Sequence, residues 1–336
     1  MNFRALFVAL ATISVLVGAQ KSPQEIQKQI DSAQKEFAEA KKMFNPYYAG
    51  PLLAASAHNV PPGHFLLQPY LFFNTDYGVY DSDRKVDSTT SSFSFQPLAV
   101  MQTGILDVLD LSVIPSASFN WKSKQSAQNF DDLSVQFGMQ FNKETYRWPA
   151  IRIVVGETFP TGKFENLNPA KQGIDATGGG SFVTLLGFYI SKVVWFWPDH
   201  PMQLRGNVQY TMSQPLDVHN YNAYGGGVGT IGKVAPGNEL TLDGSFEYSV
   251  VQNWVIACDF VYKSFDRTTF SGTPGVDTTG ATAVIGGDDG YQFSVAPALE
   301  YNPSEGLQFI AGPWFTVTGK NAVAFVNILA SVCMVF

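Results

Sequence analysis

The last sixteen residues of the chain, Asn321 to Phe336, read NAVAFVNILASVCMVF. Counted back from Phe336, every second residue is apolar: Met334, Val332, Ala330, Ile328, Val326, Ala324 and Ala322. A period of two over this length predicts a β-strand with one face in an apolar medium. We expect the opposite face, with Phe325, Leu329 and Val335, to point away from that medium.

Both ends of the chain predict export to a membrane. A long strand that closes on Phe336 resembles the C-terminal strand of bacterial outer-membrane β-barrels. At the other end, residues 1–19 read as a signal peptide, with Arg4 before the apolar stretch Ala5–Val17 and small residues before the cut at Ala19. These features predict a location in the bacterial outer membrane, with its lipid as a partner.

Composition narrows the class of protein. The formal net charge is −7, which argues against a nucleic-acid partner. Two cysteines, Cys258 and Cys333, do not make a disulfide scaffold, and we favour two free cysteines in the wall of the protein. An exported chain with 14% aromatic residues and alternating strands is either a secreted sandwich or an outer-membrane barrel.

The spacing of the strands favours the barrel. Strand-like segments begin near residues 64, 90, 106, 132, 149, 179, 202, 238, 253, 290, 306 and 321. Long links at about 75–89, 121–131, 160–178, 213–237 and 265–289 alternate with short ones. A meander through a membrane gives this pattern of short periplasmic turns and long external loops. We predict an all-β fold, a transmembrane antiparallel up-and-down β-barrel of about twelve strands over residues 63–336.

An amphipathic helix precedes the barrel. Ser22, Pro23 and Glu25 form a helix start, and a heptad seam follows with Ile26, Ile30, Ala33, Phe37, Ala40 and Phe44. The helix could form a homo-oligomer through residues 22–44, lie on the membrane, or fold back as a plug. Residues 45–63 read as a linker, so we expect a periplasmic helix and linker over residues 20–62.

Charged side chains at the inward positions of the strands are the candidate lumen-lining residues. Charge facing lipid is costly, so these side chains should face water or one another. They form either a salt-bridged filling or a selective pore, two roles that do not exclude each other. The candidates are Arg152, Arg205, Glu239, Asp243, Glu247, Asp259, Lys263 and Glu300.

Prolines inside several predicted strands conflict with a closed barrel, because proline cannot donate to the ladder. We expect bulges or kinks at these positions, and a kink could alternatively open a lateral gap in the wall. The residues concerned are Pro69, Pro97, Pro115, Pro297 and Pro313.

The sequence offers no clear catalytic or metal constellation. We interpret His58, His64, His200 and His219 as linker, turn or loop residues, since none adjoins a serine in a strand. No Cys/His cluster has metal-ligand spacing, and the glycine-rich runs lack the setting of a phosphate loop. We therefore expect no enzyme activity, no cofactor and no metal.

Short motifs carry a family resemblance. Gly156–Lys163 reads GETFPTGK, and Thr177–Ser181 reads TGGGS; Val60–Gly63 precedes the first strand as VPPG. These motifs resemble those of the outer-membrane family labelled meta-pathway phenol-degradation proteins. The resemblance implies a porin-like transport channel for small hydrophobic or aromatic solutes. The alternative is a structural protein whose barrel anchors an oligomerising N-terminal helix.

Overall fold

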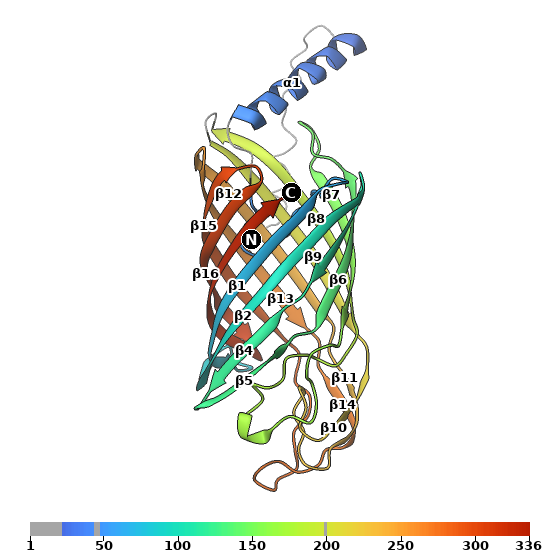
Figure 1. Ribbon diagram of the computed structural model, residues 1–336, viewed down its shortest axis with the longest axis vertical. Helices are drawn as coiled ribbons and strands as arrows, with labels where there is room; N and C mark the ends of the chain where they lie inside the picture. The colour runs from blue at the N-terminus through green and yellow to red at the C-terminus, as the bar shows by residue number, and fades with distance from the viewer. Residues whose placement is uncertain (1–21, 44–47, 198–199) are drawn as a thin grey trace, which may run out of the picture.

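The computed structural model describes residues 22–43, 48–197 and 200–336. A closed antiparallel barrel of twelve strands dominates it, because β1 pairs with β2 on one side and with β17 on the other (Figure 1). The predicted fold class is therefore confirmed. The barrel strands are β1 (Phe65–Tyr80), β2 (Val86–Leu106), β3 (Leu109–Ile114) continued by β4 (Ala117–Lys122), β5 (Gln125–Phe130) continued by β6 (Leu133–Asn142), β7 (Ala150–Phe159), β8 (Val183–Trp197), β9 (His200–Ser213), β12 (Glu239–Val251), β13 (Trp254–Phe265), β15 (Gly290–Ser304), β16 (Leu307–Lys320) and β17 (Ala322–Val335).

The terminal strand β17 alternates as expected over most of its length. Val326 and Ile328 are exposed on the outside, whereas Asn327 and Leu329 are buried inside. The prediction is wrong at the start of the strand, where Ala322 and Ala324 are buried and Val323 is exposed. There β1 carries an extra residue between Asp76 and Gly78, and such a bulge shifts the register of the ladder.

The outer face of the barrel is apolar along most strands. Large side chains such as Phe137, Phe188 and Ile256 are exposed, whereas inward-facing polar side chains such as Arg152 and Glu247 are buried. In lipid each backbone polar group needs a partner, and closure of the sheet provides one for every strand edge. An apolar outer face and a closed sheet are the features that a membrane-spanning barrel requires.

The two ends of the barrel differ. Short turns and the C-terminus lie at one end, which makes it the periplasmic end, and long loops lie at the other (Figure 1). The external loops hold a separate three-stranded sheet and a short helix that the sequence analysis missed. These elements are η1 (Pro169–Lys171), β10 (Leu216–His219), β11 (Ile231–Ala235) and β14 (Thr269–Thr273).

Two of the predicted external loops are wrong. Residues 75–89 continue β1 and β2 almost to their turn, and residues 121–131 form a hairpin of β4 and β5. The hairpin turns at Ser123 and Lys124, whose φ angles of 47° and 66° are those of a two-residue hairpin turn. Residues 86–91 of β2 and most residues of β5 are exposed, so these stretches lack the apolar alternation that identifies a strand.

The prolines are accommodated by interruptions of the ladder, as expected. Pro115 lies between β3 and β4 and divides them. Pro297 and Pro313 lie in an unpaired stretch between β15 and β16, while each keeps its place in register with its other neighbour strand. Pro69 lies in an unpaired stretch between β1 and β17. Each proline thus needs no ladder donor on its interrupted side.

The N-terminal helix α1 (Pro23–Met43) lies outside the barrel at the periplasmic end (Figure 1). Its predicted start is confirmed: the Glu25 amide donates to Ser22 Oγ at 3.2 Å, and the Ser22 amide donates to Glu25 Oε2 at 2.9 Å. No helix in the described ranges is long and apolar enough to cross a membrane. The signal-peptide prediction and seam residue Phe44 lie outside the described residues.

Candidate functional site: the lumen and the segment inside it

The stretch Tyr48–Val60, here called the inner segment, runs through the lumen of the barrel rather than outside it. Its backbone amides donate to carboxylates on three different strands. The Gly50 amide lies 2.9 Å from Glu247 Oε1, and the Ala54 amide lies 3.0 Å from Asp259 Oδ1. The Val60 amide lies 3.4 Å from Asp110 Oδ2. The predicted linker is therefore a bound part of the interior.

The barrel also donates hydrogen bonds to the inner segment. Arg152 Nη1 lies 3.1 Å from the Ser56 carbonyl oxygen, and Asn207 Nδ2 lies 3.2 Å from that of Ala55. The sequence of the segment explains this recognition. Its small and apolar residues leave the backbone bare, and a buried backbone N–H or C=O must find a partner.

Apolar packing fixes the middle of the inner segment. Leu52 is only 2% exposed and packs into a cluster with Ala257, Ala298 and Leu329. The alanines leave space for the Leu52 side chain on strands that otherwise carry acidic residues. Burying one leucine contributes roughly 1.5–3 kcal/mol, so this contact is comparable to one hydrogen bond from the segment to a carboxylate.

The structure brings most of the candidate lumen residues together in buried positions. Arg205 Nε donates to Glu247 Oε2 at 2.7 Å, and both side chains are almost fully buried. Arg152 likewise pairs with Asp110 across the lumen face of β3 and β7. The buried candidates are Arg152, Arg205, Asp243, Glu247, Asp259 and Glu300.

Glu239 and Lys263 lie apart from that group. Their side chains pair at 2.9 Å and are 31% and 40% exposed, at the external ends of β12 and β13. They belong to the external mouth rather than to the part of the lumen that holds the inner segment.

The position of the Arg152 side chain requires a glycine at residue 138 of the neighbouring strand β6. A Cβ atom on Gly138 would lie 2.0 Å from Arg152 Nη2, so the guanidinium occupies the space that a side chain would take. This arrangement holds Arg152 against Asp110 and beneath the inner segment. Sequence reasoning missed Asp110, although it occupies the inward parity of β3 and could have been found by the same alternation.

A cavity of about 320 Å³ lies between the inner segment and the strands β1 and β2. Its apolar lining on the barrel side consists of Leu66, Tyr70 and Phe72 of β1 and Leu98 and Val100 of β2, here called the apolar wall. Polar and charged side chains complete the lining on the barrel side, among them Gln68, Gln102, Gln136, Arg152 and Arg205. A second cavity of about 360 Å³ adjoins it towards the periplasmic end, since Ser56 and Arg205 line both. Small-molecule sites commonly occupy roughly 300–1,000 Å³.

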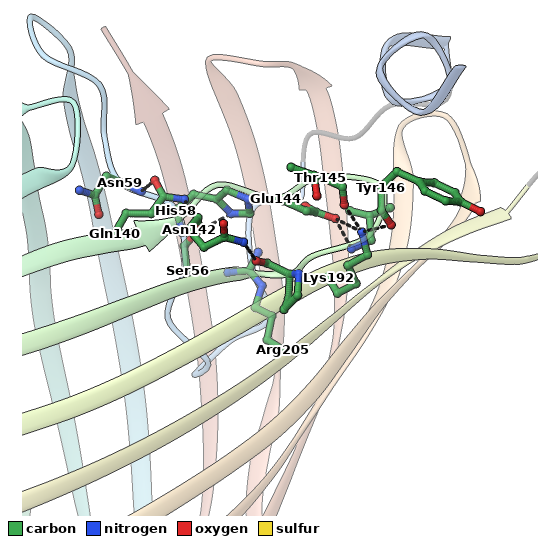
Figure 2. A network of polar contacts seen from close by, with 12 residues as sticks. Ser56, His58, Asn59, Gln140, Asn142, Glu144, Thr145, Tyr146, Lys192 and Arg205 are labelled. Carbon is green, nitrogen blue, oxygen red and sulfur yellow. Dashed lines mark hydrogen bonds and ion pairs between the residues drawn. The ribbon is translucent and has the colours of Figure 1, made fainter. Parts of the chain in front are cut away.

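Polar contacts tie the inner segment to the periplasmic rim (Figure 2). His58 Nε2 lies 3.6 Å from Glu144 Oε2, and its Nδ1 lies 3.5 Å from Ser56 Oγ. Ser56 Oγ also accepts from the His58 amide at 3.0 Å, so Ser56 and His58 form a local turn. Glu144 Oε1 also lies 3.7 Å from Lys192 Nζ of β8, so Glu144 connects this turn to β8.

The same rim holds helix α1. Phe37 is 8% exposed, with its ring centroid 5.3 Å from that of Trp195 and Lys192 Nζ 4.7 Å above it. The Tyr146 amide donates to Gln34 Oε1 at 2.9 Å. One face of the helix is therefore attached to the barrel, directly before the chain enters the lumen.

Two of the three motifs that carry the family resemblance, Gly156–Lys163 and Thr177–Ser181, lie at the external end of the barrel. Asp132, at the break between β5 and β6, accepts from the Gly162 and Gly179 amides, both at 2.8 Å. The Tyr224 hydroxyl donates to the Gly179 carbonyl oxygen at 2.7 Å, and burial raises the pKa of Tyr224 to about 12. The glycine-rich motifs are thus structural elements that fasten the loops at the external mouth.

Both cysteines are free, as the sequence analysis favours. Cys333 is buried and lines the two cavities, whereas Cys258 is only partly buried. Neither contributes a cross-link to the barrel.

Comparison with one solved structure, an outer membrane channel, supports the fold. The chain is similar to a COG4313 outer membrane channel from Pseudomonas putida F1, with a TM-score of 0.63 and 14% identity over 84% of this chain and 98% of that chain. The chain is also similar to the transport unit of the autotransporter AIDA-I from Escherichia coli, with a TM-score of 0.46 and 10% identity over 90% of this chain and 98% of that chain. No family model and no curated protein matches the chain. The protein is thus a twelve-stranded β-barrel of the outer-membrane type.

Proposed function

We propose that this protein is an outer-membrane channel for small apolar or aromatic solutes, with the inner segment as its removable obstruction. The cavity between the inner segment and the apolar wall carries the proposal. Tyr70, Phe72 and Leu98 line it, and its volume of about 320 Å³ suits a single-ring solute. The resemblance of the loop motifs to the phenol-degradation family supports the same class of solute.

Passage requires the inner segment to move. It lies between the two walls of the lumen and separates the cavity from the buried acidic side chains. Its hydrogen bonds contribute roughly 0.5–1.5 kcal/mol each, and those to charged groups roughly 1.5–3 kcal/mol. Contacts of this size can break and re-form, so the segment can yield to a solute while the closed barrel keeps its ladders.

Solute flux into liposomes tests the proposal. Vesicles containing the mature protein should take up benzyl alcohol faster than empty vesicles, and a chain without residues 20–62 should take it up faster still. The matched control lacks residues 22–43 alone, so it loses the helix and keeps the inner segment. Equal uptake by all vesicles would overturn the channel proposal.

The exposed N-terminal part of the seam of helix α1 favours a second function. Ile26 and Ile30 of the predicted seam are 47% and 44% exposed, while Phe37 of the same seam packs on the barrel. In this proposal the barrel anchors a helix whose exposed seam binds the helix of a second copy. The double variant Ile26→Ser with Ile30→Ser should then convert a cross-linkable oligomer into a monomer. A wild-type monomer in lipid at all protein concentrations contradicts it.

A further inference from the structure

The periplasmic turn between β6 and β7, residues 143–149 and here called the rim turn, contacts both helix α1 and the inner segment (Figure 2). On the helix side, the Tyr146 amide donates to Gln34 Oε1 at 2.9 Å. On the lumen side, Glu144 Oε2 lies 3.6 Å from His58 Nε2 of the inner segment. The rim turn therefore joins an element outside the barrel to one inside it.

A series of side-chain contacts crosses the rim turn. Phe37 of α1 lies against Lys192 of β8, whose Nζ is 4.7 Å from the centre of the ring. Lys192 Nζ also donates to the Tyr146 carbonyl oxygen at 3.0 Å and lies 3.7 Å from Glu144 Oε1. Glu144 then contacts His58 through its other oxygen. The series runs from the helix, through β8 and the rim turn, to the inner segment.

Glu144 makes this series sensitive to the helix. Its side chain is only 2% exposed, and its Oε1 accepts from the Val193 amide at 2.6 Å. A buried carboxylate is costly unless donors and a cation compensate its charge. Lys192 is that cation, and the Phe37 ring packs against it. Loss of the helix contact therefore weakens the compensation of Glu144 and, with it, the contact to His58.

The covalent chain couples the same two elements. Helix α1 ends at Met43 and the inner segment begins at Tyr48, so four residues separate them in the sequence. The chain from Met43 to Tyr48 spans at most about 18 Å when it is fully extended. At the lumen end of this connection, the Ser249 hydroxyl donates to the Tyr48 hydroxyl at 3.0 Å. A helix that moves away from the rim beyond this reach pulls Tyr48 from that hydrogen bond.

We propose that helix α1 is a latch that keeps the inner segment in the lumen. While Phe37 is docked, Lys192 and Glu144 hold the rim turn against the segment, and the short connection limits its movement. When the helix leaves the rim, both constraints are lost, and the segment can leave the lumen from its periplasmic end. This inference rests on the proposed channel function and adds its regulation, since the position of the helix then sets how often the path is open.

The attachment of the helix is small enough to be reversible. Among the residues of α1 whose side chains are described, Phe37 is the only buried one. Elements with few buried apolar contacts open locally at a much lower cost than the core of the same protein. The helix can therefore detach and dock again while the ladders of the barrel stay intact.

Cys333 is a native reporter of the segment, because it is 5% exposed and lines both cavities beside it. In the full mature chain with Cys258→Ser, it is the single thiol. A water-soluble methanethiosulfonate is added to this protein in detergent, and mass spectrometry follows the labelled fraction. We expect Phe37→Ala to raise the labelling rate about tenfold, the change produced by about 1.4 kcal/mol of lost docking free energy. The control Lys28→Ala alters an exposed residue of the same helix and should leave the rate unchanged. Equal rates for Phe37→Ala and the unaltered helix overturn the inference.

Glu144→Gln tests the path through the rim turn. It removes the charge that pairs with Lys192 and should also speed the labelling of Cys333. If the helix and Glu144 act through one path, the variant with both substitutions is labelled no faster than the faster single variant. Increases that multiply in the double variant contradict the path. Phe37→Ala changes a side chain outside the barrel, so it decides the main point even if Glu144→Gln does not fold.

Failure of the channel proposal has a separate signature, because labelling of a thiol does not require that solutes cross the barrel. Faster labelling of Phe37→Ala without uptake of benzyl alcohol by liposomes supports the latch and rejects the channel. Uptake of benzyl alcohol together with unchanged labelling supports the channel and rejects only the latch.

Discussion

Two sides of the lumen contact the inner segment differently, although the same alternation of strand residues makes both. One is the acidic wall, the lumen face of β9, β12, β13 and β15, which carries the buried Asp243, Glu247, Asp259 and Glu300. The other is the apolar wall. The acidic wall holds the segment by its backbone, with Glu247 and Asp259 as acceptors. The apolar wall leaves a cavity of about 320 Å³ between itself and the segment. The acidic wall thus binds the inner segment, whereas a cavity separates the apolar wall from it.

Removing the inner segment should produce the largest effect, because it exposes both walls at once. We expect a chain that lacks residues 48–60 to show a severalfold higher single-channel conductance and weaker rejection of large ions. Single-channel recording in planar bilayers measures both quantities. Conductance unchanged by the deletion would mean that the segment does not limit flow.

Breaking the ion pair of the acidic wall should destabilise the barrel. Arg205→Met leaves Glu247 buried without its partner, and loss of one member of a buried pair costs about 3–5 kcal/mol. The control is Lys263→Met, which breaks the half-exposed pair with Glu239 and should cost under about 1 kcal/mol. Urea unfolding in detergent measures the difference in unfolding free energy. Equal losses in the two variants would refute the ranking.

A larger side chain at Gly104 of β2 would clash with the end of the inner segment at Val60. A Cβ atom on Gly104 of β2 would lie 2.3 Å from the Pro61 carbonyl carbon and 2.4 Å from the Val60 carbonyl oxygen. Gly104→Val should therefore push the exit of the segment off the barrel and raise conductance modestly without altering stability of the sheet. Gly244→Ala is the control, since nothing lies within 4 Å of its Cβ position.

The smallest effect is expected outside the lumen. Asp132→Ala removes the acceptor of the Gly162 and Gly179 amides and should cost roughly 1–3 kcal/mol locally. We predict faster cleavage of the loop 160–182 by an added protease, with the single-channel conductance unchanged. A changed conductance would mean that this loop, and not only the inner segment, limits flow.

The fold was largely predictable because a strand between lipid and lumen meets two different media. That contrast produces the alternation in β9, β12 and β17, and their starts were placed within a few residues. The hairpin β4–β5 was missed because neither strand has a buried face: no residue of β4 or β5 is buried, and most of β5 is exposed. The shift at Ala322 and Ala324 was missed because a bulge on β1 leaves no mark on the sequence of β17.

The candidate site was predictable only on the side of the barrel. Arg205 and Glu247 follow from parity, since a charge at an inward position must find a partner. No such rule predicts that the inner segment lies inside the barrel. Its small residues resemble a linker, and what binds it is the backbone, which every sequence has.

Recognition through backbone amides has a consequence for evolution. The carboxylates of the barrel accept hydrogen bonds from backbone amides of the inner segment, so binding does not depend on the identity of most of its side chains. In the proposed channel, related proteins can therefore exchange the residues of this stretch, and so alter how often the pore opens, while the carboxylates that bind it stay the same. The substrate range and the opening frequency of such a channel can then diverge independently within one lineage.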